Sequence, residues 1–326
     1  MQYAVIKWHF TTIVRFGNSK GQLAESDYIM HSDTLFSALC QEALAMEGEE
    51  GVQKLYTLSS NNQLIFSDTM PYSDETYFLP KPILHVAQVE RETNSVLKKE
   101  HKNLKYISAT HYNDYIEYLN NQKAFDVINE NKLLANLVTH ENRVMVSIQG
   151  NEASQPFHVD GWRFADNAGL YFLVGYEAEE EMSWLESLLY RLELSGVGGK
   201  RNIGFGKFEM DDPFYLDEYA YSDGLLALWS LLNKKGTYSM TLSNALPTEE
   251  EMQGVLDDAS YRILKRSGFV SSSAYAKEQR KHRDLYVFSA GSCFKTKFAG
   301  DIYDVAMNGN HPVYRYAKPF FVGVSE

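Results

Sequence analysis

LLYRLELSGVGGKRNIGFGKFEM, residues Leu188–Met210, decides the fold, because an apolar stripe at helical spacing runs here into five glycines within positions 196–206. Glycine tolerates positive φ and lets a backbone approach a ligand closely, with its N–H groups exposed as an anion nest. Three basic side chains that suit phosphate groups accompany the glycines: Lys200, Arg201 and Lys207. We predict a helix that ends at Ser195 and a phosphate-gripping, glycine-rich loop at Ser195–Lys207. The alternative is a helix C-cap and tight turn whose cations are solvated.

Two familiar nucleotide-binding motifs are excluded by the residues of this loop. A P-loop whose Gly-Lys pair is Gly199-Lys200 would need glycine in place of Leu194 and serine or threonine in place of Arg201. A dinucleotide fingerprint that starts at Gly196 would need glycine in place of Arg201, and it would follow a strand instead of a helix.

Composition narrows the class of protein. The 326 residues are 44% hydrophobic, enough for real cores. No long apolar run or leader is found, two cysteines form no disulfide framework, and the nine histidines show no metal-ligand spacing. We expect a soluble, cytoplasmic protein without metal or cofactor. The net charge of −12 hides an excess of +6 in residues 260–326, where 11 basic residues face 5 acidic ones.

Strands and single helices alternate along the chain. Period-two alternation predicts a strand at Ala4–Phe10, and an apolar stripe after His31 predicts a helix of about a dozen residues with Ser32 or Asp33 as its N-cap. Residues 85–165 are polar and less regular, with hairpin-like alternation around Val144–Phe164.

The second half of the chain repeats this mixture. Thr248-Glu249-Glu250-Glu251 has the form of a capping box, and Val313–Val322 has the pattern of a strand. We predict an α+β fold with antiparallel sheets, built as two ferredoxin-like domains at 1–212 and 237–326. An acidic boundary and a connecting helix at 213–236 join them.

The glycine-rich segment resembles the loop of the RAMP superfamily, the repeat-associated RNA-binding proteins of CRISPR systems. Six further stretches narrow the resemblance to the subunit that caps the crRNA 5′ handle in type III-A (Csm) effector complexes, and they reach both ends of the chain. They are HSDTLFSALCQEAL (His31–Leu44), YFLPKP (Tyr77–Pro82), ALP (Ala245–Pro247), YRILKRSGFV (Tyr261–Val270), LYVFSAGSCF (Leu285–Phe294) and VYRYAKPFF (Val313–Phe321).

The resemblance implies two RRM-like folds, the first carrying the glycine-rich loop and a thumb-like β-hairpin insertion near Thr139–Phe164. The hairpin would wedge into the guide RNA and turn one nucleotide out of the stack. The chain would be a non-catalytic subunit of a hetero-oligomeric ribonucleoprotein. Its implied partners are the crRNA 5′ handle, the large polymerase/cyclase-like signature subunit and the repeating backbone subunit.

The resemblance also implies which positions bind RNA. Those that match the family's motif are Gly196, Gly198, Gly199, Lys200, Arg201, Asn202, Gly204, Phe205 and Gly206, with His31 and Ser32 at the neighbouring helix start. Three basic residues of the C-terminal part are further candidates, with a solvated surface as the alternative: Arg266, Arg280 and Lys281.

Two side chains leave an enzymatic function open. Asp33 falls where related backbone subunits carry a target-cleaving aspartate, and the alternative is helix capping. His31 could serve as a general acid–base in a RAMP-type endoribonuclease, and the alternative is an RNA contact or a structural role. A third possibility is that the loop contacts protein only.

Overall fold

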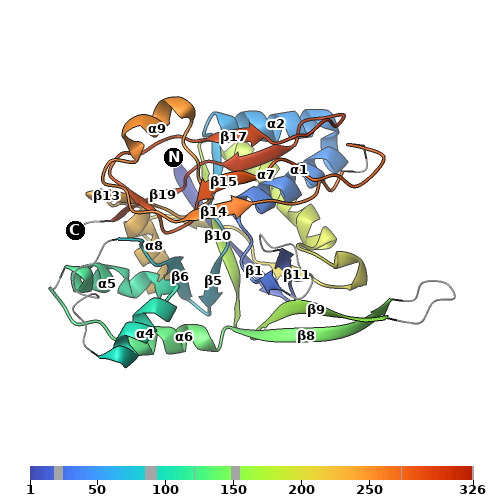
Figure 1. Ribbon diagram of the computed structural model, residues 1–326. Helices are drawn as coiled ribbons and strands as arrows, with labels where there is room; N and C mark the ends of the chain where they lie inside the picture. Colours follow the sequence, from blue (N-terminus) through green and yellow to red (C-terminus); the bar gives the residue numbers. More distant parts are fainter. Residues whose placement is uncertain (18–24, 85–93, 121, 148–154, 273, 325–326) are drawn as a thin grey trace.

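The computed structural model describes residues 1–17, 25–84, 94–120, 122–147, 155–272 and 274–324. It has a mixed α/β architecture around one large antiparallel sheet, in which β1 lies beside β10 near the centre (Figure 1). The order of the main path is β11-β1-β10-β5-β6-β7, while β12 also pairs with β1 and β4 with β10. These strands are β1 (Gln2–Phe10), β4 (Leu64–Phe66), β5 (Met70–Ser73), β6 (Thr76–Pro80), β7 (Tyr106–Ser108), β10 (Ala168–Tyr176), β11 (Phe208–Met210) and β12 (Phe214–Leu216).

The predicted N-terminal strand is confirmed as β1. The predicted helices that begin near Ser32 and end at Ser195 are also confirmed, and they lie on one face of the sheet. Helices α1 (Ser32–Glu47), α2 (Glu49–Ser60) and α7 (Glu179–Ser195) cover it. Alternate β1 side chains such as Ile6 and Trp8 are fully buried in the same core as Leu39 of α1 and Leu188 of α7. Side chains of a strand alternate between faces, so β1 sends the others to the opposite side.

The opposite face is also covered. Val5, Tyr171 and Leu173 are buried there against helix α8 (Asp223–Asn233) and helix α5 (Tyr112–Leu119). Short 3₁₀ turn η1 (Ala109–His111) precedes α5. Because both faces are packed, this sheet presents no open surface for stacking bases.

Residues 95–164 form an insertion that was predicted to be irregular apart from its hairpin. Helices α4 (Ser95–Asn103) and α6 (Val127–Ala135) pack together, and α6 leads into the hairpin of β8 (Val138–Ser147) and β9 (Gln155–Phe164). The hairpin extends away from the body of the molecule (Figure 1). Its ten paired positions run from Val138↔Phe164 to Ser147↔Gln155, which agrees with the position expected from the sequence.

The C-terminal part contains one three-stranded and two two-stranded antiparallel sheets and helix α9 (Glu249–Val255). The predicted capping box is confirmed, since Thr248 and Glu251 exchange side-chain hydrogen bonds with each other's backbone. The expected strand Val313–Val322 is split in two around Pro319, which has no N–H for a ladder. The strands are β13 (Tyr238–Thr241), β14 (Ile263–Arg266), β15 (Leu285–Phe288), β16 (Cys293–Phe294), β17 (Asp301–Asp304), β18 (Tyr314–Ala317) and β19 (Phe321–Val324).

The two halves of the chain share a core. The ring of Phe36 on α1 stacks on that of Tyr316 on β18, with 5.3 Å between the centroids, and Tyr316 Oη accepts the N–H of Phe66 at 3.0 Å. None of the helices within the described ranges combines the length and the apolar character needed to cross a membrane.

Candidate nucleic-acid interface

The glycine-rich loop adopts a conformation that requires glycine. Helix α7 ends at Ser195, as predicted, and Gly196 follows with φ +69° and ψ 173°, so its φ is positive but its backbone is not the left-handed C-cap conformation. A Cβ atom at Gly206 (φ +71°) would lie 1.8 Å from the carbonyl oxygen of Val197, and one at Gly198 (φ +81°) would lie 2.5 Å from that of Arg15. The close approach of backbone to backbone therefore excludes any side chain at these two positions.

The loop is fastened to residues 13–15, the segment between β1 and β2 (Phe16–Gly17). Gly206 donates its N–H to the carbonyl of Ile13 at 2.8 Å, and Gly199 donates to the carbonyl of Arg15 at 2.8 Å. Within the loop, Val197 donates to the carbonyl of Gly206 at 2.9 Å. The loop is thus held in one shape before any ligand binds.

Phe205, one of the predicted RNA-binding residues, lies beneath the loop. Its ring is buried in a small cluster with Ile13 and Val159. The side chain therefore anchors the loop to β9 and does not face a ligand.

The upper part of the loop, Lys200–Asn202, presents amides to solvent. The structure describes no acceptor for the N–H groups of Lys200, Arg201 and Asn202, and none for that of Gly198 among the residues it covers. Lys200 has φ +65° and precedes a single 3₁₀ turn, η2 (Arg201–Ile203). Successive N–H groups around a left-handed residue form a concave site for an anion.

Cations surround these amides. Arg201, Asn202 and Lys207 are exposed, and Arg201 also donates Nη1–H to the carbonyl of Gly196 at 3.2 Å. Lys200 Nζ lies 5.6 Å from the ring centroid of Phe157 on β9. The loop can accordingly offer both backbone donors and positive charge to phosphate oxygens.

The hairpin and the loop form one surface. The guanidinium carbon of Arg143 on β8 lies 5.3 Å from the ring centroid of Phe205. Val14 and Trp162 exchange both backbone hydrogen bonds, at 2.8 and 2.9 Å. The base of β9 is therefore joined to residues 13–15, the segment that holds the loop. An extended ligand bound to the loop would therefore also contact the base of the hairpin.

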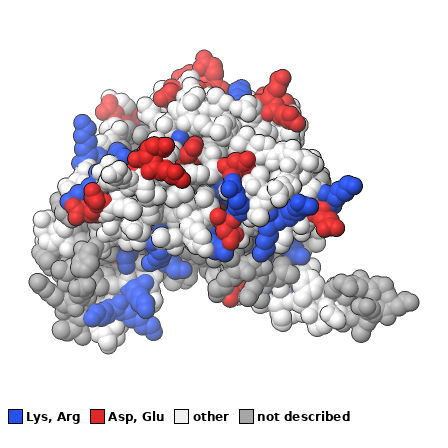
Figure 2. Space-filling view, turned by 45° about the horizontal axis from the view of Figure 1, so that its top comes forward, with Lys and Arg blue, Asp and Glu red and all other residues white. Residues whose placement is uncertain are grey.

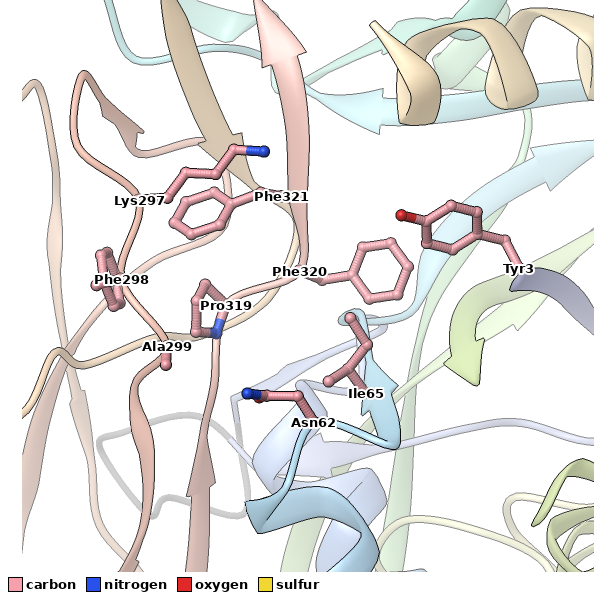
Figure 3. A pocket seen from close by; sticks show the side chains of 9 residues that line it. All are labelled: Tyr3, Asn62, Ile65, Lys297, Phe298, Ala299, Pro319, Phe320 and Phe321. Carbon is pink, nitrogen blue, oxygen red and sulfur yellow. The ribbon is translucent and has the colours of Figure 1, made fainter. Parts of the chain in front are cut away.

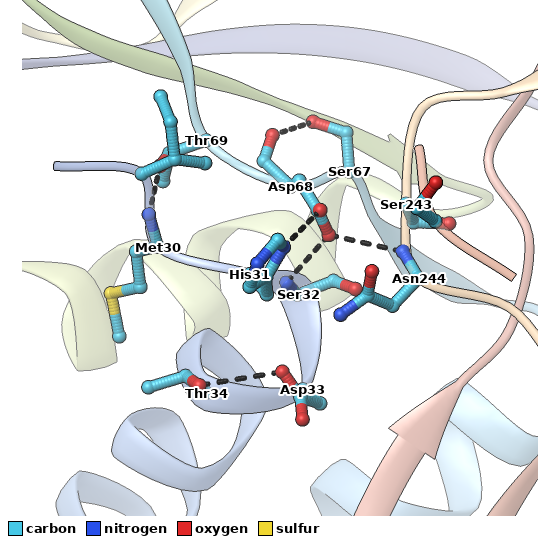
Figure 4. Close-up of polar contacts among 12 residues, drawn as sticks. Met30, His31, Ser32, Asp33, Thr34, Ser67, Asp68, Thr69, Ser243 and Asn244 are labelled. Atoms are coloured by element: carbon cyan, nitrogen blue, oxygen red, sulfur yellow. Dashed lines mark hydrogen bonds and ion pairs between the residues drawn. The ribbon is translucent and has the colours of Figure 1, made fainter. Parts of the chain in front are cut away.

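The start of helix α1 is capped from elsewhere in the chain (Figure 4). The predicted N-cap, Ser32 or Asp33, is wrong, since His31 occupies that position and caps with no side chain. Asp68, between β4 and β5, accepts the Ser32 N–H at 2.8 Å and the Asn244 N–H at 3.1 Å, and it contacts His31 Nδ1 at 2.6 Å. A buried carboxylate at a helix N-terminus also suits the helix dipole.

His31 and Ser32 differ in their access to solvent. The His31 side chain is 22% exposed, whereas Ser32 is fully buried. Of these two residues, only His31 has a side chain with access to solvent.

Asp33 is sealed in an ion pair with two arginines. Arg266 donates Nε–H and Nη2–H to its two carboxylate oxygens at 2.8 and 2.9 Å, and Arg315 donates Nη1–H at 2.9 Å. Burial alone would raise the pKa of Asp33, but the two guanidinium groups outweigh it and hold the pKa well below its ordinary value. Arg266, expected to contact RNA, is instead committed to this buried contact, which ties β14 to α1.

A cavity of about 220 Å³ lies at the seam between the two halves of the chain (Figure 3). Tyr3 and Ile65 of the large sheet lie on the side of Phe320, whereas the ring of Phe321 points toward Lys297 and Phe298. None of the predicted RNA-binding residues, all of which the structure describes, is among its lining residues. The candidate interface therefore lies elsewhere, at the loop and the hairpin.

Comparison with known proteins gives the family. Residues 234–324 match the model of the CRISPR Csm4 C-terminal domain. The CRISPR system protein Csm4 of Mycobacterium tuberculosis (strain H37Rv) is 35% identical over 295 residues, 90% of this chain and 90% of that protein. The chain belongs to the Csm4 family. Csm4 of Streptococcus thermophilus is 30% identical over 95% of this chain and 96% of its own length.

Solved structures share the fold. A chain of a crystal structure of a Csm3–Csm4 subcomplex superposes with a TM-score of 0.64 at 20% identity, covering 99% of each chain. A chain of a Csm1–Csm4 cassette in complex with cA4 gives 0.63 at 19% identity, covering 99% of this chain and 98% of the other. The Csm4 fold therefore includes the large antiparallel sheet described above.

Two predicted contacts of this Csm4-family chain lie apart from the loop. Arg280 and Lys281 are exposed on the segment that follows β14. Arg280 donates Nη1–H to the Asn308 carbonyl at 3.3 Å, and Lys281 Nζ lies 5.6 Å from the Phe269 ring centroid. Among the described residues, no group of three His, Cys, Asp or Glu side chains could hold a metal ion.

Sequence reasoning missed Asp68, because it acts through contacts with distant parts of the chain. Its partners His31, Ser32 and Asn244 lie 36 to 176 positions away. Arg143 and Phe157 were missed for the same reason. The only signal for Arg143 and Phe157 was that a basic and an aromatic residue occur within the alternating pattern that predicts the hairpin.

Proposed function

We propose that this chain is an RNA-binding subunit that grips the 5′ handle of crRNA in a type III-A CRISPR interference complex. The observation that carries the proposal is the row of amides at Lys200–Asn202, which have no acceptor among the residues that the structure describes and which lie on a loop with exposed cations. Preorganised donors bind an anion without first losing conformational entropy.

The proposed contacts are mainly to phosphate. The Lys200, Arg201 and Asn202 amides would donate to phosphodiester oxygens, and Arg201 and Lys207 would supply charge. Such contacts position a strand and carry little sequence information. Sequence preference would come from unstacked handle bases, as is usual for single-stranded RNA.

The hairpin β8–β9 would serve as the thumb. Val144 and Val146 on β8 are 62% and 56% exposed, and because they are two positions apart they share one face of the hairpin. Apolar side chains that insert between bases can open a stack. These positions support a wedge that turns one nucleotide out.

The ferredoxin-like division also belongs to this proposal. In the N-terminal part, β1, α1, β5, β10, α7 and β11 follow one another as βαββαβ, and the sheet order β11-β1-β10-β5 places the fourth strand next to the first. We assign residues 1–212 to this domain, 213–236 to a connection and 237–326 to a second ferredoxin-like domain. Because both sheet faces are packed, RNA would bind the glycine-rich loop instead of a sheet face.

The partners follow from the relatives. Csm4 chains of the same fold occur in structures with Csm3 and with Csm1. We propose that this chain likewise joins a repeating backbone subunit to a large polymerase/cyclase-like signature subunit, as a non-catalytic member of a hetero-oligomer.

A binding measurement tests the proposal. The wild type and a Lys200→Ala/Arg201→Ala variant are titrated with a 5′-handle RNA at several salt concentrations, with Lys54→Ala/Lys235→Ala as the charge-matched control. We expect weaker binding and a shallower salt dependence for the loop variant alone, since each phosphate contact releases counterions. Equal binding by all three proteins would remove the loop from the account.

The second candidate is an acid–base ribonuclease centred on His31. The specific observation in its favour is the 2.6 Å contact of Asp68 with Nδ1, which orients the ring while part of it stays exposed. Incubation with crRNA precursor and with target RNA, with and without Mg²⁺, tests it. Cleavage by the wild type that disappears in His31→Ala would establish the enzyme. Asp33 is a poor candidate for the base, because two guanidinium groups already occupy its oxygens.

A further inference from the structure

Four lysines on helices α4 and α6, together with Lys105 just after α4, make up a set of five. All five side chains are exposed: Lys98, Lys99, Lys102, Lys105 and Lys132. Among the residues that the structure describes, none of the five forms an ion pair with an acidic side chain. We call this set the lysine surface. In a chain of net charge −12, such a concentration of unbalanced positive charge is notable, and basic side chains gather at the lower left of Figure 2, over α4.

Within the two helices, the carboxylates are turned away from the lysine surface. Glu100 is the one acidic residue within α4, and its Oε2 accepts the Nδ2–H of Asn131 on α6 at 2.7 Å. Glu130 is the one acidic residue within α6, and it is buried with its Oε2 at 2.9 Å from His111 Nδ1. Both helices thus direct their negative charges inward and their lysines outward.

Helix α4, which carries three of the lysines, is held in place by the buried side chain of His101. His101 is buried on α4 and stacks on Tyr118, with ring centroids 5.1 Å apart. Its carbonyl accepts the Lys81 ammonium at 2.6 Å. Burial lowers the pKa of Lys81, and nearby Arg262 lowers it further.

The arrangement is unfavourable for the isolated helix. Lys98 and Lys102 are four positions apart and Lys99 and Lys102 three apart, so like charges face each other and destabilise the helix. A bound polyanion would relieve this repulsion.

An RNA strand fits the surface better than a protein does. Lysine is depleted at protein–protein interfaces, whose centres are enriched in Tyr, Trp, Phe and Arg. Neither α4 nor α6 contains Phe, Tyr or Trp. Lysine clusters without aromatic residues are typical of contacts with phosphates that carry no sequence preference.

We propose that the lysine surface binds the phosphodiester backbone of the RNA beyond the 5′ handle, without reading its sequence. The proposal rests on the proposed function in one respect, namely that the handle lies at the loop beside the hairpin. Helix α6 runs directly into β8 along the lower edge of the molecule, so a strand leaving the hairpin can continue along α6 and α4 (Figure 1).

The test compares two RNAs that share a 5′ end, one covering the handle only and one extended at its 3′ end. The variant is Lys98→Gln/Lys99→Gln/Lys102→Gln, and the control Lys54→Gln/Lys235→Gln/Lys297→Gln removes the same charge elsewhere. Glutamine keeps helix propensity, and circular dichroism confirms folding.

For the extended RNA we expect the α4 variant to lower the slope of log K against log salt by about 2, from three contacts at about 0.7 each. Handle-only RNA should bind both variants equally. Equal loss in variant and control, or equal loss for both RNAs, would overturn the proposal. So would an α4 variant that binds the extended RNA normally but is lost from the assembled particle, because that result indicates a protein partner. Failure of the proposed function shows separately, as Lys200→Ala/Arg201→Ala binding handle-only RNA like the wild type.

Discussion

Three glycines of the loop, each replaced by alanine, separate the causes that hold its shape. At Gly199 the φ angle is not positive, and a Cβ atom would meet nothing closer than 3.6 Å. At Gly204, φ is +88° with no atom within 4 Å, so only the left-handed backbone is penalised. At Gly206, φ is +71° and the Cβ atom would also lie 1.8 Å from the Val197 carbonyl oxygen.

The expected losses in the free energy of unfolding follow this order. Gly199→Ala should change it by less than about 0.5 kcal/mol, as at an ordinary surface site. Gly204→Ala should cost about 1–2 kcal/mol for a left-handed alanine. Gly206→Ala should cost about 2–5 kcal/mol, because displaced backbone adds about 1–3 kcal/mol.

Urea denaturation of each variant gives these values, and handle-RNA titration of the same samples gives affinity. We expect affinity to fall in the same order, because the Lys200–Asn202 amides lose their alignment. Gly206→Ala with the stability and the affinity of Gly199→Ala would refute the loop conformation.

Three other perturbations have definite expected outcomes. Despite burial, arginines hold the pKa of Asp33 below its unfolded value of about 3.9, so its stabilisation is complete above that pH and is lost as pH falls toward the folded pKa. Asp33→Asn should therefore cost about 3–5 kcal/mol at pH 7 and less below about pH 4, as urea titrations at several pH values will show. Asp68→Ala leaves buried N–H groups without acceptors and should cost about 1–3 kcal/mol by thermal unfolding. Val144→Ser/Val146→Ser should keep stability within about 0.5 kcal/mol but reduce the fluorescence increase of 2-aminopurine placed at the displaced nucleotide.

Elements with local signals could be predicted from the sequence. Period-two alternation located β1 and the hairpin, and helical stripes located α1 and α7. The capping box at Thr248 and the end of α7 at Gly196 depend on neighbouring residues, so they too were predictable.

Features that depend on distant parts of the chain could not be predicted. The insertion helices α4, α5 and α6 are short, and they are held by contacts such as His101 with Tyr118. Arg266 is 233 positions from Asp33, so its buried pairing left no local pattern, and its charge alone favoured a surface role. In the same way, nothing in the sequence near Phe205 indicated that Ile13 and Val159 bury its ring.

A cryo-EM map of the assembled particle with its guide tests the central claim most directly. We predict a phosphate of the handle within hydrogen-bond distance of the amide nitrogens of Lys200–Asn202, with the base of the β8–β9 hairpin beside the next nucleotides. A map in which another protein covers these amides, with the handle held on a different surface, would contradict it.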